Sequence, residues 1–409
     1  MSHTETHVKP LTTSQQSRAW AGPAIFSYGF RPFFLFGAAW AAGAMVLWML
    51  MLSGVLMLPT RFDPVLWHAH EFLYGYIGAI IAGFLLTAVP NWTGRLPVVG
   101  WALAGLFALW VTGRVAVATS ALWPAGIVAG IDLSFPTVLG GVILREIVAG
   151  KNWRNLVILA LLALFALSNL LFHMEAAGSG IAAGGYGQRL GVSTVIMMIA
   201  VIGGRVIPSF TRNWLVQQKS VHLPVPPMRG FDKITLGVTL LALGLWVVLP
   251  DHRITGAALV VIGVLHFIRV VRWQGWQTLS EPLLLVLHLA YIFVPAGAVA
   301  IGLSQLWPDA VSVAAAQHLW MAGAGGLMTL AMMTRATLGH TGQTLRAGSG
   351  TVAIYLALIG STIARVCAGF MFGSAMVFYS LSALLWVFAF AGFAVLYGPC
   401  LIRPKPARA

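Results

Sequence analysis

The stretch VLWHAHEFLYGYIGAIIAGFLLTAV, residues 65–89, decides the fold class of this chain. It contains one acidic residue, Glu71, and no lysine or arginine among apolar, aromatic, small and histidine side chains. A helix needs ~20 consecutive, mostly apolar residues to cross the hydrocarbon core of a bilayer. This stretch is therefore predicted to form a membrane-spanning helix that carries two histidines and a carboxylate near its start.

The whole chain shares the apolar character of this stretch. Of its 409 residues, 59% are hydrophobic and 8% are charged, and the mean hydropathy is +0.87. Soluble domains carry about 25% charged residues, so a soluble fold is excluded. Apolar runs bounded by Pro, Gly, Trp and charged residues predict an all-α polytopic membrane protein with about twelve transmembrane helices. We place these spans at residues 31–57, 65–89, 97–118, 121–145, 153–175, 184–208, 232–249, 254–273, 280–303, 309–334, 350–372 and 375–401.

The spans predict one transmembrane domain over residues 25–402, between a polar tail, 1–24, and a basic tail, 403–409. The N-terminal segment lacks the apolar region of a signal peptide, so the first span is expected to stay uncleaved. Cys367 and Cys400 lie in separate apolar runs, which excludes a disulfide framework.

The net charge of +14 comes from 24 Lys and Arg against 10 Asp and Glu. In a soluble protein this excess would suggest a nucleic-acid partner, but cytoplasmic loops of membrane proteins also collect Lys and Arg. The tails and even-numbered loops hold 18 of these residues, whereas the odd-numbered loops hold Arg61 and Arg253. We therefore predict that both termini are cytoplasmic, that the lipid bilayer is the main partner, and that no nucleic acid binds.

A weak internal repeat occurs where the second, sixth and tenth spans end. The endings read PNWTGR (90–95), PSFTRN (208–213) and TRAT (334–337). Similar endings at four-helix intervals predict three pseudo-symmetric four-helix units, since repeated topology is common in membrane proteins. The alternative is that Pro, Asn and Thr only stop helices at the headgroup interface.

Eleven histidines are many for so apolar a chain, and ionisable groups at membrane depth usually face a cavity or the bundle interior. On a regular helix His68 and Glu71 share a face, whereas His70 points roughly 200° away from His68. The two histidines then cannot bind one ion. One could be an axial ligand while the other lies in a second site or is hydrogen bonded. Alternatively, both are interfacial histidines beside Trp67.

His266 and His288 form a second candidate pair. Their spans are predicted to form an antiparallel hairpin whose turn centres near Gln277, and each histidine lies 11 residues from it. Imidazoles at equal depth on adjacent helices could bind a metal or face one cofactor, because neutral imidazole suits Cu, Fe and Zn. The alternative is that each is hydrogen bonded to a different neighbour.

Three further histidines are sorted by depth. His318 and His173 fall in the periplasmic half, together with the start of the second span. His340 falls on the opposite, cytoplasmic side.

Three arginines, Arg114, Arg189 and Arg365, lie in the periplasmic half of their spans, where acidic residues are few. A guanidinium there requires an anionic partner, and it pairs well with carboxylates. A bound carboxylate ligand would serve, and so would a structural ion pair such as Arg114 with Asp132.

Several motifs, in order along the chain, resemble the NnrS family of membrane proteins. The likeness runs from about Phe30 to the last span. The motifs are WHAHE (67–71), GFLLTAVPNWTG (83–94), the Asn169 to His173 segment, GRVIP (204–208) and RATLGHTG (335–342). This resemblance implies a protein of the bacterial inner membrane that takes part in the response to nitric oxide, contains haem, of the b type, and copper, and has nitric oxide or a related small molecule as its partner.

The twelve-span arrangement also resembles the catalytic subunit of haem-copper oxidases, in which spans 2 and 10 hold haem ligands. By this analogy His68 or His70 faces His318 across a haem. Glu71, one turn from His68, would accept a hydrogen bond from that imidazole and so favours His68. The implied partners of the haem propionates are Arg114, Arg189 and Arg365.

The copper candidates are His266, His288 and His173, and His340 is a weaker candidate. The sixth span contains no histidine, so the copper site of the oxidases cannot be carried over.

Three functions follow. The first is a haem- and copper-binding protein that binds or detoxifies nitric oxide, or protects against iron-nitrosyl stress. The second is a transporter of an anion, metal or proton along buried His and Arg. The third is a quinol-linked redox enzyme acting on a substrate derived from nitric oxide. An optical spectrum with metal analysis separates the haem proteins from the transporter.

Overall fold

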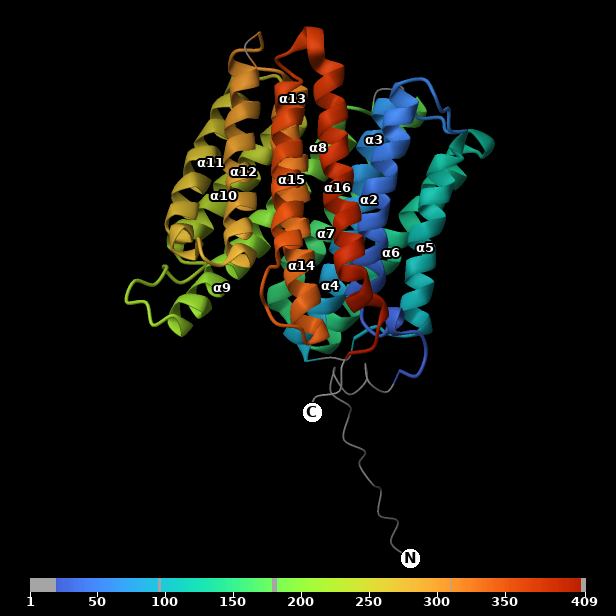
Figure 1. The fold of residues 1–409 in the computed structure, drawn as a ribbon. Coiled ribbons are helices and arrows are strands. Elements are labelled where there is room, and N and C mark those ends of the chain that lie inside the picture. The colour runs from blue at the N-terminus through green and yellow to red at the C-terminus, as the bar shows by residue number, and fades with distance from the viewer. Residues whose placement is uncertain (1–19, 95–96, 179–181, 310, 406–409) are drawn as a thin grey trace, which may run out of the picture.

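The computed structural model describes residues 20–94, 97–178, 182–309 and 311–405. Most of both predicted tails, residues 1–19 and 406–409, lies outside the described residues. Within them the chain is all helix and turn, and its long helices run side by side in one bundle (Figure 1). The predicted class, an all-α polytopic membrane protein, is confirmed.

The long helices fall into three consecutive sets of four spans, and the second span of each set is built from several segments. The first set contains α2 (Phe30–Leu52), the continuous run of α3 (Pro64–His70), η2 (Glu71–Ile77) and α4 (Gly78–Thr93), then α5 (Trp101–Ala118) and α6 (Ala125–Ala149). The second contains α7 (Leu156–Gly178), the run of α8 (Tyr186–Met198), η5 (Ile199–Gly203) and α9 (Gly204–Gln217), then α10 (Gly230–Val248) and α11 (Arg253–Val271). The third contains α12 (Pro282–Leu306), the run of α13 (Val313–His318), η7 (Leu319–Leu327) and α14 (Met328–Thr341), then α15 (Ser349–Cys367) and α16 (Ala375–Ile402). Short 3₁₀ turns are η1 (Ala24–Phe26), η3 (Ser120–Leu122), η4 (Trp153–Asn155), η6 (Gly275–Thr278) and η8 (Phe372–Ser374).

Eleven helical runs of the described chain are long and apolar enough to cross a membrane. The predicted tenth span is also one helical run, Val313–Thr341, but it is less apolar than the others because it carries Gln317, His318 and several glycines. The first span ends at Leu52, five residues before its predicted end at 57, because Gly54 turns the chain with a φ of 74°.

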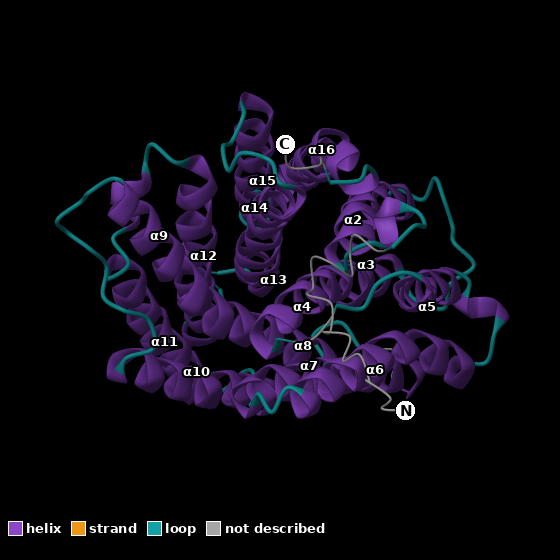
Figure 2. Cartoon of the chain, turned by 90° about the horizontal axis from the view of Figure 1, so that it is seen from below, coloured by secondary structure: helices purple, strands orange, loops and turns teal. Residues whose placement is uncertain are grey.

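The three segmented spans share one departure from regular helix. Segments η2, η5 and η7 are π-helical and interrupt spans 2, 6 and 10, the spans whose endings predicted the repeat. Spans 2 and 6 are 78% and 72% buried over their most apolar windows, more than any other candidate span in the described chain. Seen from below, α4 and α8 lie in the middle of the bundle, with α5 and α6 at one end and α10 and α11 at the other (Figure 2). Since π-helical segments are frequent at functional sites, these inner spans are the first place to search.

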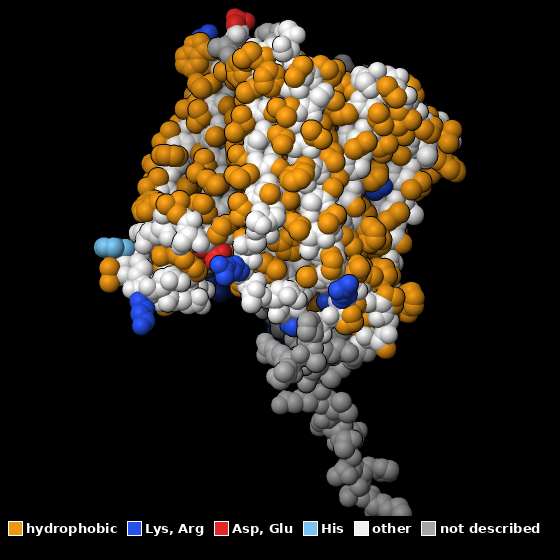
Figure 3. Space-filling model, in the orientation of Figure 1, with side chains coloured by type: hydrophobic (Ala, Val, Ile, Leu, Met, Phe, Trp, Pro, Cys, Tyr) orange, Lys and Arg blue, Asp and Glu red, His pale blue; other side chains and the backbone are white. Residues whose placement is uncertain are grey.

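The outer surface matches a bilayer. Hydrophobic side chains cover the middle of the bundle in Figure 3, and most visible Lys and Arg side chains gather at the end from which the N-terminal trace leaves. The two described ends of the chain meet there, because the Arg31 guanidinium donates to the carbonyls of Leu401 and Arg403, both at 2.8 Å. Both ends therefore lie on one side of the bundle. The cytoplasmic orientation of that side remains a prediction.

Candidate functional site

The WHAHE motif lies where span 2 changes from α-helix to π-helix. Asp63 caps α3 by accepting hydrogen bonds from the backbone amides of Val65 and Leu66, and η2 begins at Glu71. His68 and His70 project to different sides of this helix and contact different neighbours. The ring of His68 stacks on Trp48 of α2, whereas the ring of His70 packs against spans 4 and 5.

His70 belongs to a fully buried polar cluster contributed by spans 2, 4 and 5. Its Nε2 lies 3.1 Å from Asp132 Oδ2 and 3.1 Å from Asn169 Oδ1. His173 Nε2 lies 3.1 Å from the same Asp132 oxygen, and Asn169 Nδ2 donates to that oxygen at 2.7 Å. One nitrogen or oxygen atom from each of His70, Asp132 and His173 lies within 4.8 Å of the others, so the three side chains could hold one metal ion.

A second layer of contacts orients this cluster. Glu71 Oε1 lies 3.1 Å from His70 Nδ1 and accepts a hydrogen bond from Arg114 Nη1 at 2.7 Å. Arg114 Nη2 also pairs with Asp132, which leaves two carboxylates against one guanidinium. Trp40 donates to the other Glu71 oxygen at 2.8 Å. With both imidazoles neutral, as metal ligation requires, the cluster carries a formal charge of −1 in a buried setting, which a bound cation would compensate.

Gly75 of η2 makes the close approach of these side chains possible. A Cβ at this position would come within 2.6 Å of Arg114 Nη1 and 2.8 Å of Glu71 Oε2. The carbonyl of Gly75 also accepts a hydrogen bond from Trp110 at 2.9 Å, so this segment is tied to span 3.

Two imidazoles and one carboxylate are a common donor set for Fe(II), and imidazole also suits copper and zinc. The Glu71 carboxylate on the far nitrogen of His70 matches the usual support of a metal-bound histidine, which sets its tautomer and orientation. In the described structure the same atoms satisfy one another by hydrogen bonds. Metal binding would exchange the contacts of Asp132 with His70 and His173 for metal–ligand bonds.

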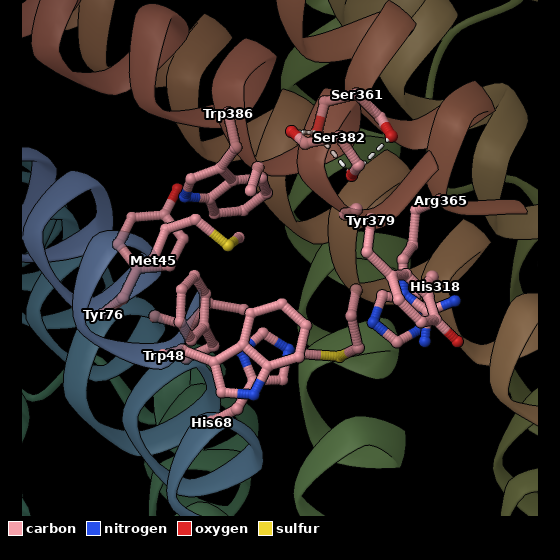
Figure 4. Close-up of a pocket in the computed structure, with 15 residues that line it drawn as sticks. Met45, Trp48, His68, Tyr76, His318, Ser361, Arg365, Tyr379, Ser382 and Trp386 are labelled. Carbon is pink, nitrogen blue, oxygen red and sulfur yellow. Dashed lines mark hydrogen bonds between the residues drawn. The ribbon is translucent and has the colours of Figure 1, made fainter. Parts of the chain in front are cut away.

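His68 faces a different pocket, between spans 1, 2, 10, 11 and 12 (Figure 4). Its ring lies 6.3 Å from the ring of His318 between centroids, and the two planes are within 11° of parallel. The pocket is partly open, with about 560 Å³ of space between its lining atoms when the open part is included, and its walls include Trp48, Tyr379 and Trp386.

Several polar atoms at this pocket lack partners among the described residues. They are His68 Nδ1 and the Nε and Nη1 atoms of Arg365, whose guanidinium lies over the Tyr379 ring at 4.7 Å. His318 Nδ1 donates to the Ala314 carbonyl at 2.7 Å, which leaves its Nε2 for another partner. Buried polar atoms are rarely left unsatisfied, so these atoms indicate a ligand that the protein alone does not supply.

The donor atoms at this pocket are of the kind that a haem would need. Two imidazoles that share one ion at ~2 Å from each nitrogen have ring centroids roughly 6 Å apart, close to the separation of His68 and His318. A proximal histidine whose Nδ1 donates to a backbone carbonyl, as in His318, ligates through Nε2. Arg365 offers unpaired donors of the kind that bind a propionate carboxylate.

The other predicted partners of this site lie elsewhere. The hydrogen-bond partners of Glu71 are His70, Arg114 and Trp40 rather than His68. Arg114 belongs to the cluster around Asp132, which is the ion pair weighed from the sequence. Arg189 donates to the carbonyls of Val247 and Gly184 near the end of its span.

The predicted pair His266 and His288 is divided between two sets of partners. Both ring nitrogens of His266 are engaged, by Thr239 at 2.9 Å and by Tyr291 at 3.0 Å. His288 Nε2 lies 2.8 Å from Thr211 Oγ1, and its ring packs on Trp273.

His340 packs between the rings of Tyr28 and Phe30, at the end of the bundle opposite His68, His70, His173 and His318. This position leaves it apart from both pockets.

Asp132 and Asn169 are site residues that the sequence alone did not select as ligands. Asp132 is an acidic residue within an apolar span, which is itself a signal. Asn169 and His173 are four residues apart and so share one helix face. What the sequence lacks is the information that these faces meet His70.

A family model described as NnrS protein matches residues 24–405, nearly the whole chain. No curated protein matches the chain.

Proposed function

Because the chain belongs to the NnrS family, we propose that it is a haem- and copper-binding membrane protein of the bacterial nitric oxide response. The observation that carries this proposal is the pocket between His68 and His318. Their imidazole rings are nearly parallel there, and nitrogen atoms of His68 and Arg365 lack hydrogen-bond partners among the described residues. When bound, a haem supplies an iron centre that takes small ligands or exchanges electrons.

The protein's own residues divide the work of holding the haem. His318 is held in place by the Ala314 carbonyl and offers Nε2. His68 is held by stacking on Trp48, with ring centroids 4.2 Å apart, and offers an unpaired ring. Arg365 would bind a propionate, while the aromatic walls exclude water. If both histidines held the haem, the site would suit electron transfer. If only one did, the other could contact a small molecule bound in the pocket.

We place the copper at the cluster of His70, Asp132 and His173. Of the copper candidates predicted from the sequence, His173 belongs to this group. Imidazole ligands suit copper, and the charge of −1 that the cluster carries favours any bound cation. His266, with both nitrogens occupied, is better explained as a structural residue.

A redox enzyme acting on a substrate derived from nitric oxide is the second candidate. It is favoured because His68 and His70 lie two residues apart on one helix and so bring the two proposed sites close together. The alternative of a transporter has less support, since the space between the inner spans is lined by apolar side chains, and ions need polar lining.

An optical spectrum of the purified protein, with metal analysis, tests the proposal. We expect a Soret band in the wild type that is lost or altered in His318→Ala and unchanged in His340→Ala, a matched histidine outside both pockets. A folded wild-type protein without Soret absorbance would refute the haem. A loss confined to His340→Ala would move the haem to the other end of the bundle.

A further inference from the structure

A cavity lies between the three inner spans, separate from both candidate sites. Its walls come from η2 and α4 of span 2, α8, η5 and α9 of span 6, and α14 of span 10, with Phe34 of α2. Ile80, Met198 and Met328 represent these three walls. The space between these walls is about 740 Å³ when the part that opens to the outside is included.

The walls offer no free hydrogen-bonding group. The side chains are aliphatic, aromatic or thioether, apart from Thr329. The Thr329 hydroxyl is already bonded, to the carbonyls of Gly325 and Gly326 and to the hydroxyl of Tyr76. Cavities of this kind stay dry and bind small apolar molecules such as xenon. An ion or a polar metabolite would lose its hydration there without replacement.

The cavity adjoins the neighbouring pockets, with which it shares wall residues. Towards the end that carries the termini, it shares Phe84, Val206 and Met332 with a pocket that reaches Arg335 and His340. Towards the other end, it shares Ile77 with the pocket of His68 and His318.

It also borders the polar cluster, because Ile81 lines both the cavity and a small space beside Asp132 and Asn169. A molecule that entered from the end near His340 would pass Arg335 and His340 and then meet the apolar walls of the cavity before it reached either candidate site.

We propose that this cavity binds a small, uncharged, apolar molecule of the diatomic-gas class and conducts it from the end near His340 to the pocket of His68 and His318. Its apolar lining and the pockets that adjoin it towards both ends of the bundle carry the inference. The binding step stands on the cavity alone, whereas the delivery to a haem rests on the proposed function.

Xenon tests the binding step without any haem. In crystals of the full chain under xenon pressure, we expect an anomalous peak between Ile80, Met198 and Met328. Ile202→Phe replaces an aliphatic side chain of the cavity wall, in the π-helical segment of span 6, by a larger aromatic ring and should abolish the peak. Val216→Phe makes the same aliphatic-to-aromatic change later in span 6, at a side chain that is 55% exposed, and should retain the peak. If Ile202→Phe does not fold, Val206→Phe serves in its place, because Val206 lines both the cavity and the pocket that reaches His340.

An empty cavity in the pressurised wild type, or an ordered lipid or detergent chain in it, would overturn the proposal. The delivery step is tested in haem-containing protein by carbon monoxide recombination after photolysis. We expect slower recombination from solvent in Ile202→Phe than in Val216→Phe, with unchanged spectra. Equal rates would overturn the conduit and leave the binding site. Absence of haem would refute the proposed function while the xenon peak still supports the cavity.

Discussion

Replacing His173 by alanine separates a metal ligand from a structural hydrogen bond. In a structural role, His173 contributes one hydrogen bond, at 3.1 Å to Asp132 Oδ2, beside the packing of its ring on Phe62 and His70. Removing one partner of a buried hydrogen bond costs about 1–3 kcal/mol. The cost should be near the lower limit, because Asp132 keeps its contacts with Arg114 and Asn169.

In a metal site the loss is larger and depends on the metal. Changes to residues that merely support a ligand cost about 10–100-fold in metal affinity, so losing a ligand should cost at least ~100-fold. At a metal concentration 100 times the dissociation constant, the wild type gains about 2.7 kcal/mol of unfolding free energy. The variant, with its dissociation constant raised to that concentration, gains about 0.4 kcal/mol. Copper should therefore stabilise the wild type by about 2.3 kcal/mol more than His173→Ala.

The assay is unfolding of detergent-solubilised protein, after chelation and with copper restored, together with copper analysis of the same samples. His340→Ala is the control, since it removes a histidine that packs on Tyr28 and Phe30 away from the cluster. The metal site is refuted if copper stabilises the wild type and His173→Ala equally. It is also refuted if copper content is unchanged while stability falls by the hydrogen-bond amount alone.

Three other expectations concern the scaffold. Gly75→Ala should lower the unfolding free energy by about 1–3 kcal/mol, because its Cβ would lie 2.6 Å from a guanidinium nitrogen of Arg114. Gly140→Ala, with open space around it, should leave the unfolding free energy unchanged, and thermal unfolding of both variants measures the difference. Asp232→Asn keeps the size of the side chain but should destabilise the protein by about 3–5 kcal/mol, because the fully buried Arg269 loses the carboxylate that it meets at 2.7 Å. Denaturant unfolding measures this loss of stability. A cytoplasmic reporter fused after Ala409 should be active, and a periplasmic reporter fused there should be inactive. Activity of the periplasmic reporter would overturn the predicted orientation.

Hydropathy predicts the spans well because burial in lipid demands long apolar runs, but it does not predict how the runs end. Span 6 was expected to stop at Pro208, yet its helix continues to Gln217. Arg212 and Asn213 follow that proline on a polar extension, which a search for apolar runs cannot detect. Helix interruption by proline is tolerated in membrane helices when neighbours satisfy the freed backbone groups.

The candidate sites show a different limit. The spacing of His68 and His70 indicates two opposite directions, and the structure places the two rings against different spans. The spacing also paired Glu71 with His68, but in the structure the Glu71 carboxylate is engaged by Arg114 and Trp40. These partners come from other spans, so the spacing within span 2 does not contain them. The meeting of His70 with Asp132 and His173 depends on how three spans pack, which no local pattern contains.

The three π-helical segments offer a physical reason for the arrangement of both sites around span 2. Regular helices would pack closely along their whole length, whereas a π-helical turn widens the helix and shifts its register against its neighbours. In span 2 this turn begins one residue after His70 and places Glu71 against His70 and Arg114. In span 10 it begins one residue after His318, which keeps that histidine on the last turn of α13, where Ala314 can hold it. The corresponding segment of span 6 has no histidine beside it and instead lines the apolar cavity through Ile199, Ile202 and Gly203. One structural device, repeated three times, thus holds ligands in two of the inner spans and open space in the third.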